Sequence, residues 1–138
     1  MSDRVKKVSY AYVMVPNRAG QGLKVLDALR KMEIDLTAFS AFPGRRGKTQ
    51  VDLVLNDMSA LKRVARQSDW RLSKVKKGFL IQGEDRLGAV HRQLAKLAAA
   101  KISVTAADAV SAGNGRYGMI LWVKQKDHAR AARALGAR

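Results

Sequence analysis

The two halves of the sequence repeat each other, and this repeat is the strongest constraint on the fold. Residues 17–55 align with residues 85–123 at a constant offset of 68 residues and without a gap. Because chance does not keep one register through several expected helices and strands, the chain contains a duplicated module. Identical pairs include Arg18/Arg86, Gly20/Gly88, Leu26/Leu94, Leu29/Leu97, Ile34/Ile102, Thr37/Thr105, Ala38/Ala106, Gly47/Gly115 and Leu53/Leu121.

Each copy of the module has the same order of expected elements. An apolar run predicts a strand, a one-sided apolar pattern predicts a helix, and a Gly-rich hairpin joins two further strands before a second helix. Leu23, Leu26 and Leu29 are expected on the apolar face of the first helix, and Ser59 and Asp127 are expected to cap the second helices. The expected ranges are 8–15, 20–33, 34–42, 49–55 and 59–67 in the first copy, and 79–82, 88–101, 102–110, 117–123 and 127–135 in the second.

This order predicts an α+β fold, a ferredoxin-like βαββαβ sandwich whose helices cover one face of an antiparallel sheet. Two tandem repeats are expected, residues 1–75 and 76–138. The segment 70–82 must hold both the closing strand of the first repeat and the opening strand of the second, without a turn signal. The second repeat has no closing strand of its own, so it is either truncated or shares strands between units or chains.

Composition limits the classes of function. Lys and Arg number 27 against 11 Asp and Glu, a formal charge of +16 that attracts anions of any kind. There is no cysteine, and His91 and His128 have no partner at metal-ligand spacing, so we expect no disulfide, metal or other cofactor. No nucleophile and base stand out together, which argues against an enzyme. No signal peptide or membrane-length apolar run is found, so the cytoplasm is the expected location.

Two stretches resemble a known family. EDRLGAVHRQLAKLAAAKISVTAADAV, residues 84–110, resembles the ACT domain pattern, in which a strand leads into D-R-P-G-x-L, a helix, G-I-N-V and a second strand. NRAGQGLKVLDALRKMEIDLTAF, residues 17–39, resembles it more loosely. The resemblance covers nearly the whole chain and implies a small bacterial protein made of two ACT domains alone. Ala19 and Leu87 replace the family's Pro, and Glu33 and Lys101 replace the Gly after the helix.

The resemblance also implies a site for a small-molecule ligand, such as an amino acid, where two units meet. The strand-to-helix loop of one unit would face the second strand of the other, and the positive end of the helix dipole suits a carboxylate. An Arg of the loop would pair with a carboxylate, and the Asn or Asp before it would cap the helix or bind an ammonium group. The implied residues are Asn17, Arg18, Ala19, Gly20, Gln21, Gly22, Ile34, Asp35, Leu36, Asp85, Arg86, Leu87, Gly88, Ala89, Ile102, Ser103 and Val104.

Two other functions stay open. The charge and the stretch GRYGMILW would suit nucleic-acid binding, but the basic residue and Gly are in the wrong order for an RNA-binding strand, and Tyr117 and Trp122 are expected to pack in the sheet. The other is an ACT fold that only associates, without ligand. A homo-oligomer, such as a dimer, is expected because Tyr10, Tyr12 and Met14 make the face of the first strand that no helix covers apolar as well.

Overall fold

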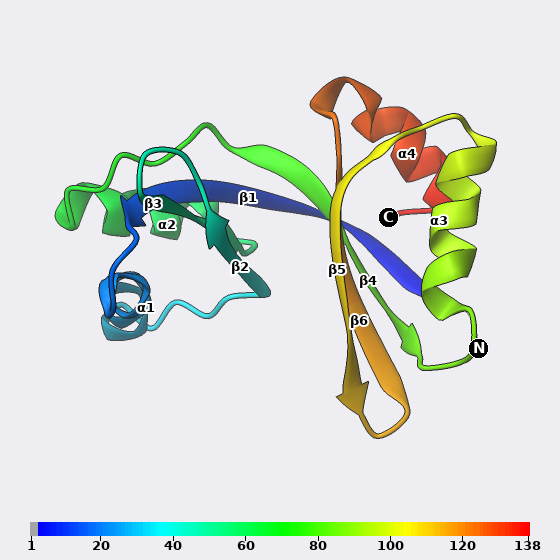
Figure 1. Ribbon diagram of the computed structural model, residues 1–138, viewed down its shortest axis with the longest axis horizontal. Helices are drawn as coiled ribbons and strands as arrows, with labels where there is room; N and C mark the ends of the chain where they lie inside the picture. The colour runs from blue at the N-terminus through cyan, green and yellow to red at the C-terminus, as the bar shows by residue number, and fades with distance from the viewer. Residues whose placement is uncertain (1–2) are drawn as a thin grey trace. The chain divides into compact units, whose positions relative to one another are not determined.

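A computed structural model describes residues 3–138, which form two compact units (Figure 1). The first-repeat unit comprises residues 9–76, and the second-repeat unit comprises residues 3–8 and 77–138. This grouping differs from the expected division at 75/76 chiefly in residues 3–8, which join the second repeat. The strands pair antiparallel and the helices cover one face of the sheet, so the predicted α+β, ferredoxin-like class is confirmed.

The first-repeat unit is built around the later part of a long strand. Strand β3 pairs antiparallel with β1 on one side and β2 on the other, in the order β2-β3-β1. The segment after the second helix runs along β1, since the Ser73 N–H donates to the Tyr12 carbonyl at 2.9 Å. This segment therefore takes the place of the closing strand expected for the first repeat. The elements are β1 (Arg4–Pro16), α1 (Gln21–Lys31), β2 (Ala38–Pro43), β3 (Lys48–Val54) and α2 (Met58–Gln67).

The second-repeat unit takes its closing strand from the start of the chain. Its strands lie in the order β1-β4-β6-β5, with β6 antiparallel to both β4 and β5. Val5 of β1 packs in the same apolar cluster as Phe79 and Ile81 of β4. The strand that the second repeat lacks is therefore supplied by sharing β1. The elements are β4 (Lys76–Glu84), α3 (Ala89–Ala99), β5 (Val104–Gly113), β6 (Arg116–Val123), the 3-10 turn η1 (Gln125–Asp127) and α4 (His128–Leu135).

Helix α1 faces the core with a different set of residues from the predicted one. Val25 and Leu29 are each 2% exposed, whereas Leu23 is 60% and Leu26 is 37% exposed. The buried stripe follows the i, i+3, i+4 spacing of Val25, Ala28 and Leu29, which leaves the other two leucines at its edge. The prediction was right for Leu29 and wrong for Leu23 and Leu26.

The caps of the second helices also differ from expectation. Asp57, not Ser59, caps α2, because its carboxylate accepts from the Ala60 N–H at 3.0 Å. Asp127 stands at the cap position of α4, but its carboxylate accepts from Arg130 at 3.2 Å and makes no cap bond. The Ser59 prediction was therefore wrong.

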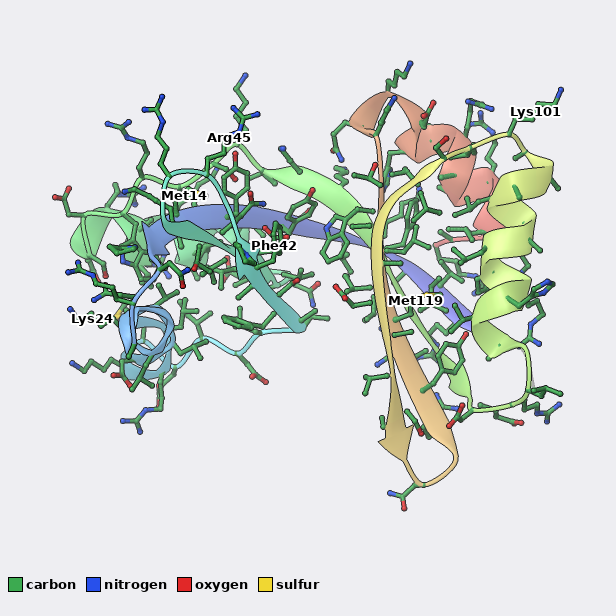
Figure 2. The ribbon with its side chains drawn as sticks, viewed as in Figure 1. Met14, Lys24, Phe42, Arg45, Lys101 and Met119 are labelled. Atoms are coloured by element: carbon green, nitrogen blue, oxygen red, sulfur yellow. The ribbon has the colours of Figure 1, made fainter. Side chains whose placement is uncertain are left out.

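Basic side chains surround both units. Figure 2 shows Lys24, Arg45 and Lys101 extending outward from the ribbon, and all three are exposed. The apolar side chains gather instead in one cluster per unit, of which Met119 of β6 is a member, with 2% exposure. The charge of the chain is thus carried outside two separate cores.

Candidate ligand-binding site

The strand-to-helix loop of the second repeat, residues 85–88, joins β4 to α3. Gly88 makes the turn in the left-handed region, with φ 80° and ψ 12°, a conformation that glycine adopts without steric cost. The Asp85 N–H donates to the Gly115 carbonyl at 2.8 Å, which fixes the loop against the β5–β6 hairpin. No side chain caps α3, so the expected capping by Asp85 does not occur and the amides of the first turn lack a side-chain acceptor.

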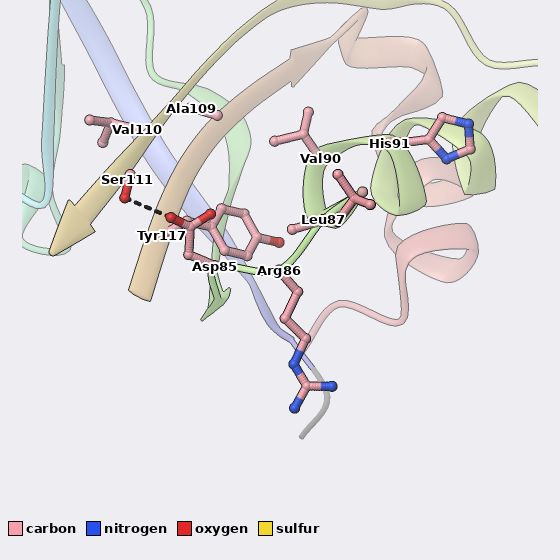
Figure 3. Close-up of a pocket in the computed structure, with 11 residues that line it drawn as sticks. Asp85, Arg86, Leu87, Val90, His91, Ala109, Val110, Ser111 and Tyr117 are labelled. Atoms are coloured by element: carbon pink, nitrogen blue, oxygen red, sulfur yellow. Dashed lines mark hydrogen bonds between the residues drawn. The ribbon is translucent and has the colours of Figure 1, made fainter. Parts of the chain in front are cut away.

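A hollow of about 500 Å³ lies beside this loop (Figure 3). That volume falls within the range of small-molecule pockets in proteins. The loop, the first turn of α3, the middle of β5 and one residue of β6 form its walls. The lining residues are Asp85, Arg86, Leu87, Gly88, Ala89, Val90, His91, Ala109, Val110, Ser111 and Tyr117.

Asp85 supplies a carboxylate to this hollow. The Ser111 hydroxyl donates to Asp85 Oδ2 at 2.6 Å, which joins the middle of β5 to the loop (Figure 3). Arg86 is directed away from Ser111 in the same view, and its Nε donates to Glu84 at 2.6 Å. The Arg86 guanidinium is thus paired with Glu84 at the end of β4, while the Asp85 carboxylate faces the β5 side of the hollow.

One wall of the hollow is fixed by a buried polar cluster. The Tyr117 hydroxyl donates to Asp3 Oδ2 at 2.7 Å, Gln93 Nε2 donates to the same oxygen at 2.6 Å, and Arg92 Nη2 donates to it at 3.3 Å. The Asp3 side chain is only 3% exposed. Burial raises the pKa of the Asp3 carboxyl, but the three hydrogen bonds and the Arg92 charge outweigh it, so the net pKa lies below its ordinary value. Burial and the Asp3 carboxylate raise the pKa of Tyr117. Asp3, the residue directly before the shared strand β1, therefore holds the wall of the hollow in place.

The loop of the first repeat, residues 17–20, has the same backbone but different side chains. Gly20 has φ 84°, the Asn17 N–H donates to the Gly47 carbonyl at 2.9 Å, and no side chain caps α1. The positions that match Asp85, Ser111 and Tyr117 are Asn17, Pro43 and Thr49. The first loop therefore has no carboxylate held by a hydroxyl.

The predicted site residues fall into separate places within each unit. Residues 85–89 all line the hollow, but Ile102 is 5% exposed in the core, and Ser103 and Val104 are exposed and outside the lining. Residues 34–36 line a different hollow of about 340 Å³, whose lining includes none of residues 17–22. Within a unit, the loop set and the second-strand set do not come together.

The sequence analysis did not predict several of the lining residues. Ala109, Val110, Ser111 and Tyr117 come from the middle of β5 and from β6, not from the start of the second strand. The alignment of the repeats held a usable signal, because a polar residue in one copy stands against an apolar one in the other. Ser111 aligns with Pro43 of the first repeat, and the buried Gln93 aligns with the buried Val25.

Tyr117 and Trp122 are 4% and 5% exposed, which confirms that they pack in the sheet. Their rings are therefore not available for stacking on bases. Within residues 3–138, no group of three or more His, Cys, Asp and Glu side chains is placed to hold a metal ion. No helix in the same range is long and apolar enough to cross a membrane.

Known structures share this fold, although no family model and no curated protein matches the sequence. Protein BT0572 from Bacteroides thetaiotaomicron aligns with a TM-score of 0.76 at 16% identity, over 97% of this chain and 88% of that chain. The ligand-free regulatory subunit of aspartate kinase from Thermus thermophilus aligns with a TM-score of 0.64 at 13% identity, over 99% and 95%. Clostridium acetobutylicum aspartate kinase, an allosteric enzyme, aligns with a TM-score of 0.61 at 12% identity, over 97% of this chain and 33% of that chain. The chain therefore has the tandem ACT-domain fold of aspartate kinase regulatory subunits.

Proposed function

We propose that the chain is a cytoplasmic, non-enzymatic regulatory protein that binds an amino acid at the loop of its second repeat and acts as a homo-oligomer. The observation that supports this most is the hollow of about 500 Å³ between residues 85–88, the first turn of α3 and β5. A regulatory subunit with the same fold supports the regulatory role.

The hollow offers partners for both charged ends of an amino acid. Val90 and His91 line it at the second and third positions of α3, where a backbone N–H has no acceptor within the helix. A ligand carboxylate would accept from these amides and would lie at the positive end of the helix dipole. The Asp85 carboxylate, oriented by Ser111, would accept from the ammonium group.

A second copy of the chain would complete the site. Leu87 is fully exposed at the rim, Val110 is 65% exposed, and every residue of the edge strand β5 is exposed. Tyr10, on the first-strand face where we expected exposed apolar surface, is buried at 9% exposure. Met14 of the same face is 38% exposed, so a partner could cover apolar surface at β5 and also at the end of β1.

Thermal unfolding against a panel of all the standard amino acids tests this proposal. We expect one or a few of them, at millimolar concentration, to raise Tm through binding to the folded state. The Asp85→Ala variant should unfold at the same temperature with and without that ligand. A flat panel for the wild-type chain would contradict amino-acid binding and would favour a fold that serves association alone.

A further inference from the structure

The charged side chains that line a second hollow of the second-repeat unit are all basic. The hollow has a volume of about 490 Å³ and runs along α4, with His128 from the start of the helix and Gly136 from its end in the lining. It shares no lining residue with the hollow beside the loop. Lys7, Lys77, Arg133 and Arg138 line it, and no Asp or Glu does.

The four cations come from separate parts of the chain, so they do not form a simple helical charge stripe. Lys7 lies on β1, Lys77 begins the second-repeat part of β4, Arg133 lies on α4, and Arg138 follows that helix. Backbone bonds hold the contributing segments together. The Lys7 N–H donates to the Arg138 carbonyl at 3.1 Å, and the Arg138 N–H donates to the Val5 carbonyl at 3.1 Å.

No Asp or Glu side chain neutralises this group, since none of the ion pairs within the described residues 3–138 involves any of the four cations. Asp127, the acidic residue at the start of α4, is paired with Arg130 at 3.2 Å. The hollow between α1 and α2 is different, because Asp27 lines it together with Lys24 and Lys31. All four cations are exposed, so water screens much of their mutual repulsion, and an anion held in the hollow would reduce the remainder.

The chemistry of the hollow favours a ligand with several negative charges on neighbouring groups. A single carboxylate would balance one of four cations, whereas a diphosphate or triphosphate carries several charges within a few ångströms. Arg133 and Arg138 can each bind a phosphate through two parallel N–H donors, and Lys7 and Lys77 add point charges. Because both ends of α4 border the hollow, neither end of the helix dipole dominates there.

We propose that this hollow binds a small ligand that carries a diphosphate or triphosphate group. Its volume suits a small molecule. His128 is the one ring in the lining, and it is stacked on Phe79 with the ring centres 4.4 Å apart. The hollow therefore lacks the row of free aromatic rings on which single-stranded nucleic acids stack. This site is independent of the amino-acid site proposed above.

Calorimetric titration with inorganic pyrophosphate, at constant ionic strength and with sulfate as the comparison anion, tests the proposal. We expect pyrophosphate to bind more tightly than sulfate. The Lys77→Ala/Arg133→Ala double variant should bind it at least about tenfold more weakly, since each charge-assisted hydrogen bond is worth about tenfold or more in affinity. The Lys24→Ala/Lys31→Ala double variant, which removes the same charge from the hollow between α1 and α2, should bind as the wild type does.

Three results would overturn the proposal. One is pyrophosphate binding no tighter than sulfate. Another is an equal loss in both double variants, which would mean that the overall field of the chain attracts the anion. The third is tight binding of a short single-stranded oligonucleotide without binding of pyrophosphate, which would assign the charge to nucleic acid. Circular dichroism of both variants checks that the fold is intact.

Discussion

The two strand-to-helix loops share one backbone conformation but differ in the polar side chains around them. Gly20 and Gly88 adopt φ of 84° and 80°, and neither helix that follows has a side-chain cap. At the other end of each helix, Ile34 and Ile102 donate to the carbonyls of Leu29 and Leu97, both at 2.9 Å. The repeat is therefore preserved in hydrogen bonds as well as in sequence.

The side chains around the loops differ where a ligand would bind. The second loop has Asp85 held by Ser111, and a wall tyrosine tied to the buried Asp3. In the first repeat, Asn17 and Pro43 stand where the second has Asp85 and Ser111. Duplication explains why both loops have the same backbone conformation. It does not explain why only the second loop has these polar side chains. Ligand binding by the second repeat supplies a reason.

Removing Asp3 should have the largest effect on stability. Asp3→Ala would leave the Gln93 amide and the Tyr117 hydroxyl buried without an acceptor, so we expect a loss of about 3 kcal/mol in the free energy of unfolding by urea. Asp108→Ala, on the exposed strand β5, serves as the control and should change stability by less than about 0.5 kcal/mol. Equal effects would mean that the cluster contributes nothing specific to the second repeat.

Protonating Asp3 should also lower the free energy of unfolding, but by less than Asp3→Ala does, because the side chain stays in place. The pKa of Asp3 is lower in the folded chain than in the unfolded one, so its contribution is complete above the ordinary value of 3.8 and is lost as the pH falls through the folded pKa. Unfolding free energies measured across the acid range should fall less steeply for Asp3→Asn than for the wild type. Parallel curves would contradict the assignment.

The two loop glycines should be equivalent in stability and different in binding. No atom lies within 4 Å of a Cβ built at Gly20 or Gly88, so alanine there meets backbone strain alone and should cost about 1–2 kcal/mol at either position. Only Gly88→Ala should also weaken the binding of the amino acid found by the thermal panel. If Gly20→Ala weakens it equally, the two loops bind alike and the proposed difference between them is wrong.

The smallest expected effect is a gain in stability at the helix ends. Glu33 and Lys101 adopt positive φ of 56° and 58°, so the left-handed turn expected after each helix is present without the glycine that favours it. Glu33→Gly and Lys101→Gly should each stabilise the chain by about 0.5–1 kcal/mol in urea unfolding. A loss at one position alone would show that the repeats differ there too.

The sequence predicted the order of helices and strands because repetition reinforces weak local signals. It did not predict the sharing of β1, since a strand of 13 residues looks the same whether it serves one sheet or two units. The carboxylate of Asp3 acquires its role only when β1 lies beside β4, 90 positions from Gln93 along the chain. Such a contact leaves no local pattern.

The loop residues and the second-strand residues of the predicted site lie in different places, and the site itself stays a prediction. Residues 85–89, which the resemblance implied, all line one hollow because they follow one another in the loop and the first turn of α3. Ser111 was missed because the expected ligand contacts were placed at the start of β5 and not at its middle. The exposure of Leu23 was missed because its spacing fits the edge of the buried stripe as well as its centre.

The most direct test of the central claim is a calorimetric titration of the best amino acid from the panel into three proteins: the wild type, Asp85→Asn and Asn17→Ala. We predict that Asp85→Asn lowers the affinity about tenfold or more, because a charged partner of the ammonium group is lost, and that Asn17→Ala leaves it unchanged. An affinity that is unchanged in Asp85→Asn, or lowered equally in both variants, would contradict the assignment of binding to the second loop.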